Sequence, residues 1–256
     1  MDTTLVKAKS HRLFHYACAA SGAICMVLFF IAMLAARFLP PTSPAWTAEE
    51  TASHYRRHEK GIQAGAALMI ISSMFYLPFS AAISFQMRRI PTASPMACNL
   101  QLAAGAAAVW TLMLPGIFLA VAVYRLDRFP EITLALNDLF WLTIPLPWPL
   151  FMIQDYAFAY AILCDPSPKP LFPKKIAMMN LAAPAIFVPA ITAHCFKTGP
   201  LAWNGAFTYW LVNFTGGVQI TIDSLCLVRA IYLDKDTSGS ASNTRSDIDG
   251  LNEPKQ

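Results

Sequence analysis

Six apolar stretches occupy most of this chain, and the fourth of them is interrupted by prolines. Each meets or approaches the roughly 20 residues that a helix needs to cross a bilayer. Only 13% of the residues are charged, whereas a soluble domain carries about 25%. The sequence therefore predicts an all-α, polytopic membrane helix bundle with about six transmembrane helices, or seven if the proline segment is re-entrant. The stretches cover residues 16–36, 62–84, 97–123, 134–161, 176–193 and 206–233.

The chain divides by composition into a basic N-tail (residues 1–15), a transmembrane domain (16–233) and a polar C-tail (234–256). The first apolar run is longer than the roughly 7–15 residues of a signal-peptide core, so we expect an uncleaved helix. The modest Lys and Arg bias of the loops places both termini in the cytosol. The C-tail has too few large apolar residues to fold and should be disordered. The net charge of +4 forms no basic stripe, so no nucleic-acid partner is expected.

Three aspartates lie within or at the edges of apolar stretches: Asp138, Asp155 and Asp223. A carboxylate at membrane depth is costly, so it is usually retained for function and faces a protein interior or a cavity. For Asp155 and Asp223, an ion pair with Arg229 or a loop lysine is an equally good explanation.

Prolines at 145, 147 and 149 break the fourth stretch. They remove three backbone donors and disfavour helix at the residues before them. Non-helical backbone at membrane depth is tolerated where it is buried in protein or lines a cavity. The segment predicts either a cavity wall that includes Trp148 or a simple kink.

The loops on the non-cytosolic side carry further polar groups. Thr47 and Glu50 have capping-box spacing, which predicts a short helix that runs to Lys60 and stops or bends at Gly61. His54 and His58 would share a face of it. A histidine pair supplies only two metal ligands, and the six cysteines contain no CxxC, so no metal site is expected.

The same end of the bundle should receive polar residues from three loops and the adjoining helix ends. Such convergence is how ligand pockets are built, although helix ends are polar in any membrane protein. The aromatic residues of the spans form either interfacial belts or a cavity that stabilises a cation. The converging residues are the segment 125–131 together with Asn137, Asp138, His194, Trp203 and Asn204.

Length, span count and four segments carry a resemblance: ITLALNDLFWL, PLPWPLFMIQDYAFAY, LFPKK and KTGPLAWNG. They resemble fungal membrane-bound terpene cyclases of the ascofuranone and macrophorin type, and also uncharacterised bacterial membrane proteins. The resemblance implies cyclisation of a farnesylated phenol or cyclohexenone, epoxidised or not, in meroterpenoid biosynthesis at the endoplasmic reticulum membrane. Its partners would be the lipophilic substrate, membrane lipids and pathway enzymes such as a prenyltransferase and an epoxidase. The chain lacks DDxxD and DxDD, so a metal-independent reaction without cofactor is expected.

Protonation of an alkene or epoxide needs an aspartate that keeps its proton, and burial favours that form. We expect Asp138 to be this acid, with Asp223 and Asp155 as alternatives and His54, His58 and His194 as a proton relay. The alternative function is a non-enzymatic membrane protein, either a proton-coupled transporter or a lipid-binding accessory subunit; the absence of an internal repeat counts against transport. The expected substrate contacts are Trp141, Trp148, Phe151, Trp110, Trp210, Asn137 and Asn204.

Overall fold

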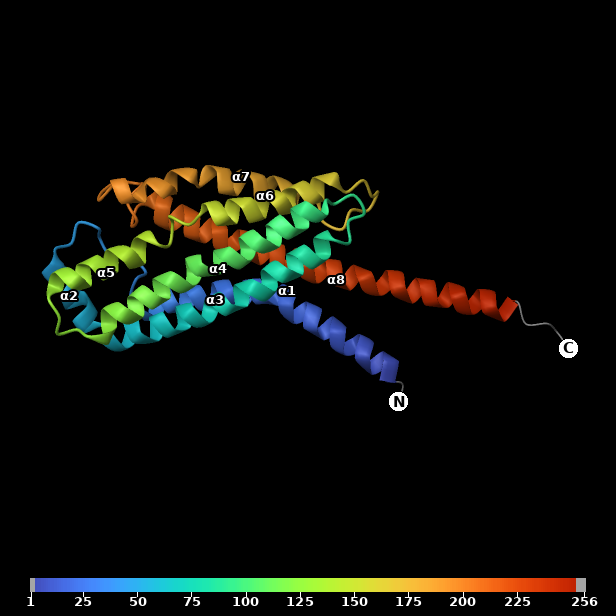
Figure 1. Ribbon diagram of the computed structural model, residues 1–256, viewed down its shortest axis with the longest axis horizontal. Coiled ribbons are helices and arrows are strands. Elements are labelled where there is room, and N and C mark those ends of the chain that lie inside the picture. The colour runs from blue at the N-terminus through green and yellow to red at the C-terminus, as the bar shows by residue number, and fades with distance from the viewer. Residues whose placement is uncertain (1–2, 252–256) are drawn as a thin grey trace.

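The computed structural model describes the backbone of residues 3–251 and the side chains of residues 11–233. Within this range the chain is a bundle of helices without strands, which confirms the predicted all-α class (Figure 1). The elements are α1 (Thr3–Ala35), α2 (Ala48–Arg57), α3 (Glu59–Met87), α4 (Pro95–Tyr124), α5 (Pro130–Leu142), α6 (Pro149–Cys164), α7 (Lys174–Ile186), the 3₁₀ helix η1 (Val188–Cys195), the π-helix η2 (Ala206–Leu211) and α8 (Val212–Leu251).

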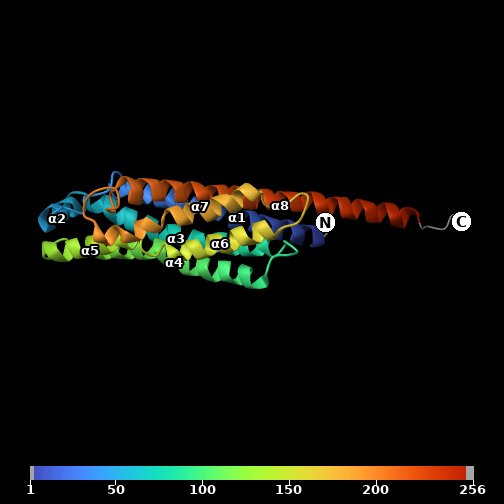
Figure 2. The ribbon, with the colours of Figure 1, turned by 90° about the horizontal axis from the view of Figure 1, so that it is seen from above.

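Five helical segments are long and apolar enough to cross a membrane, which is close to the predicted six. They are His11–Ala35, Glu59–Met87, Pro95–Tyr124, Lys174–Cys195 and Ala206–Leu233. The fourth predicted stretch is the exception, because it is divided into the two short helices α5 and α6. The long helices lie side by side, and both termini lie at the end of the bundle opposite α2 (Figures 1 and 2).

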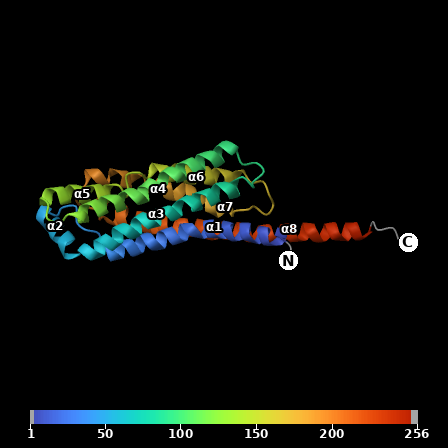
Figure 3. The same ribbon diagram turned by 60° about the horizontal axis from the view of Figure 1, so that its bottom comes forward.

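Small residues bring α1 and α3 into close contact. A Cβ at Gly61 would lie 2.3 Å from the carbonyl oxygen of Ala35, and one at Gly65 would lie 2.8 Å from that of Ala32. Small residues at such crossings let two helix backbones approach closely. The core of the bundle forms around this pair, with α4 packed on α3 and α8 packed on α1 (Figure 3).

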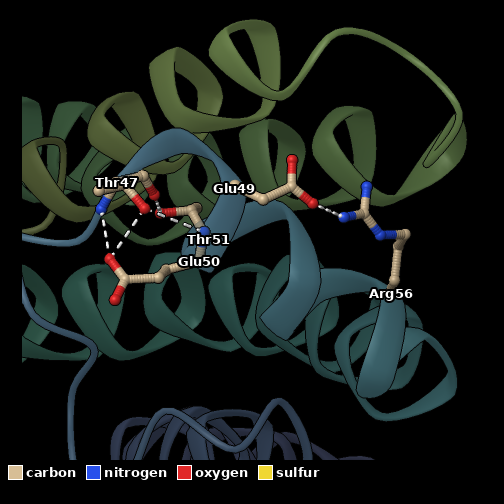
Figure 4. Close-up of polar contacts among 5 residues, drawn as sticks. All are labelled: Thr47, Glu49, Glu50, Thr51 and Arg56. Carbon is tan, nitrogen blue, oxygen red and sulfur yellow. Dashed lines mark hydrogen bonds and ion pairs between the residues drawn. The ribbon is translucent and has the colours of Figure 1, made fainter.

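The expected short helix after the first span is α2, and its capping box is present. The backbone N–H of Glu50 donates to Thr47 Oγ1 at 3.2 Å, and the Glu50 carboxylate accepts from the Thr47 N–H at 2.7 Å (Figure 4). The Arg56–Glu49 ion pair lies on the same helix. The predicted end at Lys60–Gly61 was wrong: α2 ends at Arg57 and the chain bends at His58. Gly61 lies inside α3, where it is needed for the approach to Ala35.

The proline segment is non-helical, as predicted. Residues 143–148 form consecutive turns between α5 and α6. The N–H of Trp148 donates to the carbonyl of Pro145 at 3.3 Å, which is a tight-turn contact rather than an α-helical one. Proline at the start of α6 costs nothing, because the first N–H groups of a helix have no intrahelical partner.

Helix extends into both regions that the sequence set apart as tails. α1 begins at Thr3, so most of the predicted N-tail (residues 1–15) belongs to the first helix. α8 continues to Leu251, so residues 234–251 of the predicted disordered C-tail extend the last helix, which projects beyond the bundle (Figure 1). A helix can propagate from a packed one at little cost per residue. The end of the predicted tail, residues 252–256, lies outside the described residues.

Candidate functional site

A narrow cavity of about 70 Å³ lies inside the bundle between α1, α3, α4, α6 and α8. Its lining includes Thr208 of η2 and residues Val212 to Ile220 of α8, and the α8 part has a length of roughly 12 Å at 1.5 Å per residue. Most of the lining is apolar, and Asp155 is its carboxyl group. The cavity is therefore elongated and apolar, with a single acidic residue.

The proline turn contributes one wall of this cavity. Ile144, Pro145 and Trp148 all line it. The indole N–H of Trp148 donates to the backbone carbonyl of Pro184 at 3.2 Å, which fixes the ring against α7. The turn thus places a rigid aromatic face in the cavity, a position that a continuous helix would not provide.

Two further aromatic rings extend that wall. The ring centroid of Phe151 lies 5.2 Å from that of Trp148 and 5.5 Å from that of Tyr76. These separations are typical of packed aromatic pairs. All three rings line the cavity that contains Asp155, so a cation in this space would meet aromatic faces.

Asp155 belongs to a chain of hydrogen bonds that joins α6, α8 and α7. Gln219 Nε2 donates to Asp155 Oδ2 at 2.8 Å and to Asn180 Oδ1 at 3.0 Å. Asn180 Nδ2 donates in turn to Asp223 Oδ1 at 3.1 Å. All four side chains are at least 90% buried. Two of the three aspartates singled out from the sequence are therefore connected through two amides.

A second polar group lies beside Asp155. Gln154 Nε2 donates to the Tyr76 hydroxyl at 2.8 Å, and Gln101 Nε2 donates to Ser80 Oγ at 3.2 Å. Gly105 leaves room for them, because a Cβ there would lie 1.8 Å from Ser80 Oγ and 2.3 Å from Gln154 Oε1. We refer to both groups together as the polar network: Tyr76, Ser80, Gln101, Gln154, Asp155, Asn180, Gln219 and Asp223.

The polar network has more acceptors than donors. The carbonyl oxygens of Gln101, Gln154 and Gln219 are buried without a hydrogen-bond partner. Within residues 11–233, no lysine, arginine or histidine forms an ion pair with Asp155 or Asp223. The expected pairing with Arg229 or a loop lysine is therefore absent from this part of the chain.

The α2 end of the bundle holds a separate cluster of buried aromatic residues. The indole of Trp141 donates to Thr42 Oγ1 at 2.8 Å, and that of Trp203 donates to the Thr42 carbonyl at 2.9 Å. The two indole rings are stacked, with an interplanar angle of 8°. Tyr55 donates to Asn137 Oδ1 at 3.2 Å. Of the residues expected to converge at this end, Asn137 and Trp203 belong to this cluster, which is packed and does not line the cavity.

The structure places Asp138 on α5, next to this cluster and away from the residues that line the cavity. Its Oδ1 is buried without a hydrogen-bond partner. The adjacent Asn137 is buried, with its oxygen occupied by Tyr55. Asp138 is therefore near the aromatic cluster, while Asp155 is the aspartate that faces the cavity.

The three histidines do not form a chain of hydrogen bonds to Asp138 among the described side chains. The rings of His54 and His58 lie 4.7 Å apart. Burial, His58 and Arg57 together lower the pKa of His54 to about 4, so this imidazole is neutral near pH 7. His194 is exposed and contacts the carbonyl of Ile191 at 2.9 Å. By residue type, these histidines and Asp138 could act as metal ligands. Within the described residues, however, no three His, Cys, Asp or Glu side chains lie close enough together to hold a metal ion.

Of the seven expected substrate contacts, Trp148 and Phe151 line the cavity. Trp141 is fully buried in the aromatic cluster, and Asn204 is half-buried in the loop before η2. Trp110 is 54% exposed and Trp210 is 39% exposed, so both face outward from the bundle. Outward-facing tryptophans are typical of membrane interfaces.

Sequence reasoning did not single out Gln219 and Asn180 as site residues, and it identified Tyr76 only as one of the aromatic residues of the spans. The available signal was the presence of amide side chains inside apolar stretches, because such groups hydrogen-bond across helices in a membrane. Comparisons of this chain with protein-family models, with curated proteins and with solved structures found no match.

Proposed function

We propose that this protein is a membrane-bound cyclase that closes rings on a prenylated phenol or cyclohexenone by protonating an alkene or an epoxide. One observation carries the proposal: Asp155, a buried carboxyl group without a basic partner among the described side chains, lies on the wall of an aromatic, elongated cavity. The resemblance to fungal terpene cyclases supports the same activity. The endoplasmic reticulum membrane is the proposed location, since the farnesylated substrate would reside in a bilayer.

In this mechanism the Asp155 carboxylic acid transfers its proton to an alkene carbon or an epoxide oxygen of the substrate. Protonation of an alkene uses its π electrons to form a C–H bond, whereas protonation of the epoxide oxygen breaks one C–O bond and leaves a hydroxyl group. Either step leaves a carbocation, which the next double bond attacks to close a ring. Tyr76, Trp148 and Phe151 present ring faces that stabilise the positive charge. Loss of a proton from the final cation to the Asp155 carboxylate regenerates the acid.

We assign the acid to Asp155 instead of Asp138 because a general acid must lie within hydrogen-bond reach of the atom that it protonates. Asp155 lines the cavity, and Asp138 does not. Gln219 Nε2 donates to Asp155 Oδ2. Because Oδ2 of Asp155 accepts this hydrogen bond, the proton that the acid transfers belongs on its other oxygen, Oδ1.

The cavity is smaller than the roughly 300–1,000 Å³ of ligand pockets. A farnesyl chain must therefore widen it on entry. The lining of α8 includes Gly216 and Gly217, which carry no side chains that would have to move. A Cβ at Gly216 would lie 4.0 Å from the Trp148 ring. Gly216 thus leaves room beside the Trp148 ring, whereas the space next to Gly217 is taken by Phe30.

Proton-coupled transport is the second candidate, and the buried pair Asp155 and Asp223 favours it. Ionisable residues joined inside a membrane protein often form proton relays. The pair is connected through Gln219 and Asn180. A transporter would move its ligand without changing it, whereas a cyclase makes a new product in the absence of any gradient.

The test is product analysis with microsomes that contain the full chain and are given epoxidised or unepoxidised farnesyl-phenols. We expect cyclic products, and we expect Asp155→Asn to reduce their formation about 10²–10⁴-fold. Asn is nearly the same size and still accepts from Gln219. Asp127→Asn, at an exposed position, is the matched control.

Three results would count against the proposal. Acyclic substrate recovered unchanged from wild-type microsomes would refute the cyclase. Full activity in Asp155→Asn combined with loss in Asp138→Asn would return the acid to Asp138. Equal loss of folded protein and activity in Asp155→Asn would make Asp155 a structural residue.

A further inference from the structure

The orientation of the Gln219 amide is fixed by its neighbours. Asn180 Nδ2 donates to the backbone carbonyl of Ile176 at 3.0 Å and to Asp223. A backbone carbonyl only accepts, so the nitrogen of Asn180 must lie on that side and its oxygen must face Gln219. Gln219 therefore presents its nitrogen to Asn180 and to Asp155. Its own oxygen is left without a partner.

Gln219 is 97% buried, like Gln101 and Gln154, whose carbonyl oxygens are also unpaired, but of these three residues Gln219 alone lines the cavity. Buried acceptors nearly always receive a hydrogen bond, so one without a donor indicates a missing water, ion or ligand. Gln219 and Asp155 both line the same cavity. The missing donor would therefore lie beside a carboxyl group.

The carboxyl group of Asp155 indicates whether that hydrogen-bond donor is neutral or positively charged. Within residues 11–233, no ion pair neutralises Asp155. The cavity surface around it is formed largely by apolar and aromatic groups, among them Phe29, Trp148 and Phe151. Aromatic faces attract cations, and a carboxylate hydrogen-bonds most strongly to a charged donor.

We propose that this cavity is a binding site for a lipophilic primary ammonium ion. One N–H of the ammonium group donates to Gln219 Oε1, its charge is balanced by the Asp155 carboxylate, and its hydrocarbon tail lies along the face of α8. Since the carboxylate must be ionised, binding to a protonated Asp155 releases one proton. The cavity of about 70 Å³ admits the small head group, and the tail must widen it along α8, as a farnesyl chain would.

This inference does not depend on the cyclase proposal, because it concerns binding alone. If the cyclase proposal holds, the ammonium group occupies the place of the carbocation and acts as an inhibitor. If the protein is a transporter, the same ion is a candidate cargo. Binding and ring formation are measured separately, so the failure of one proposal is distinguishable from the failure of the other.

The test compares three probes with the same tail: farnesylamine, farnesol and farnesyltrimethylammonium. Farnesol keeps a donor but has no charge, and the trimethylammonium probe keeps the charge but has no donor. Binding to the full chain in lipid nanodiscs would be measured by thermal unfolding and by competition. We expect farnesylamine to bind at least about tenfold more tightly than either of the others, because charge-assisted hydrogen bonds are roughly twice as strong as neutral ones.

Variants complete the design. Asp155→Asn and Gln219→Met should each remove the preference for farnesylamine, while the exposed Asp127→Asn should keep it. Equal binding of farnesylamine and farnesol by the wild-type protein would show that charge is not recognised and would overturn the inference. Equal binding of farnesylamine and farnesyltrimethylammonium would show that Gln219 Oε1 accepts no hydrogen bond, which also overturns it. These wild-type comparisons stand even if a variant fails to fold.

Discussion

At the residue scale, the polar network depends on Gly105, which is the position where α4 carries no side chain. Ser80 from α3 and Gln154 from α6 occupy the space that a Cβ at this position would take. Both side chains are buried, with exposures of 0% and 2%. Neither can move outward without leaving a polar group unpaired inside the bundle. The missing methyl group therefore leaves room for two hydrogen bonds to α3, one from Gln101 of α4 to Ser80 and one from Gln154 of α6 to Tyr76.

Gly105→Ala is accordingly expected to destabilise the fold by about 1–3 kcal/mol, the usual range for an overpacked core. The gain in helix propensity, about 1 kcal/mol, would offset only part of this cost. Gly216→Ala is the matched control, because its Cβ would meet no atom closer than 4.0 Å. It should be neutral or slightly stabilising. Unfolding of both variants in the same detergent gives the comparison, and equal stability would show that the network adapts freely.

The residue scale is also where sequence reasoning reached its limit. Asp138, Asp155 and Asp223 were identified from their apolar surroundings alone. Asp138 was favoured because three histidines were expected nearby and because Phe140 and Trp141 follow it, but both rings belong to the aromatic cluster at the α2 end. Which of the three aspartates faces a cavity depends on the rotation of each helix about its axis. A helix that is apolar all round has no polar face from which this rotation could be read in the sequence.

At the element scale, α2 is held by contacts that favour a neutral histidine. The ring of His54 is stacked on Phe38 with centroids 5.7 Å apart and lies 5.4 Å from Trp46. Its Nε2 is buried without a hydrogen-bond partner. Protonation would place a charge among these rings next to His58 and Arg57, which is why the pKa of His54 is lowered from 6.5 to about 4.

Stability should therefore decrease as the pH falls from about 6.5 to about 4. In this window the unfolded chain binds a proton at His54, while the folded protein does not, so protons favour unfolding. His54→Gln is neutral at every pH and should flatten this part of the profile. His194→Gln, at an exposed position, is the control. Thermal unfolding measured from pH 4 to pH 7.5 checks the prediction, and an unchanged slope in His54→Gln would contradict it.

The elements themselves were largely predictable. Span length and hydropathy located all the long helices, and the prolines at 145, 147 and 149 located the break between α5 and α6. The end of α2 was misplaced because Gly61 looks like a helix stop in sequence, although its role is contact with α1. The cavity beside the break was predicted as one of two outcomes. Choosing between a cavity and a kink required knowledge of which helices pack against Trp148.

At the scale of the whole molecule, the two termini lie at one end of the bundle and α2 at the other (Figure 1). If the bundle spans a membrane along its length, this arrangement requires an even number of crossings, and we expect the divided pair α5 and α6 to form the sixth beside the five long helices. From the Lys and Arg bias of the loops we then expect the termini in the cytosol. Cys195, at the end of η1, would face the opposite compartment. It is the one exposed cysteine among the described residues.

A membrane-impermeant maleimide tests this orientation in sealed microsomes. The partly exposed Cys18, Cys164 and Cys226 would first be changed to Ser. We expect Cys195 to be labelled only after the membrane is permeabilised, while a C-terminal epitope tag is digested by external protease without permeabilisation. Cys195→Ser should abolish the labelling. If Cys195 is labelled from outside and the C-terminal tag is protected from protease, the orientation is the reverse of the one expected. If a tag on the N-terminus is protected while the C-terminal tag is digested, the number of crossings is odd. In that case α5, the turn and α6 would not cross the membrane together, and the cavity beside Trp148 would have to open toward an aqueous compartment.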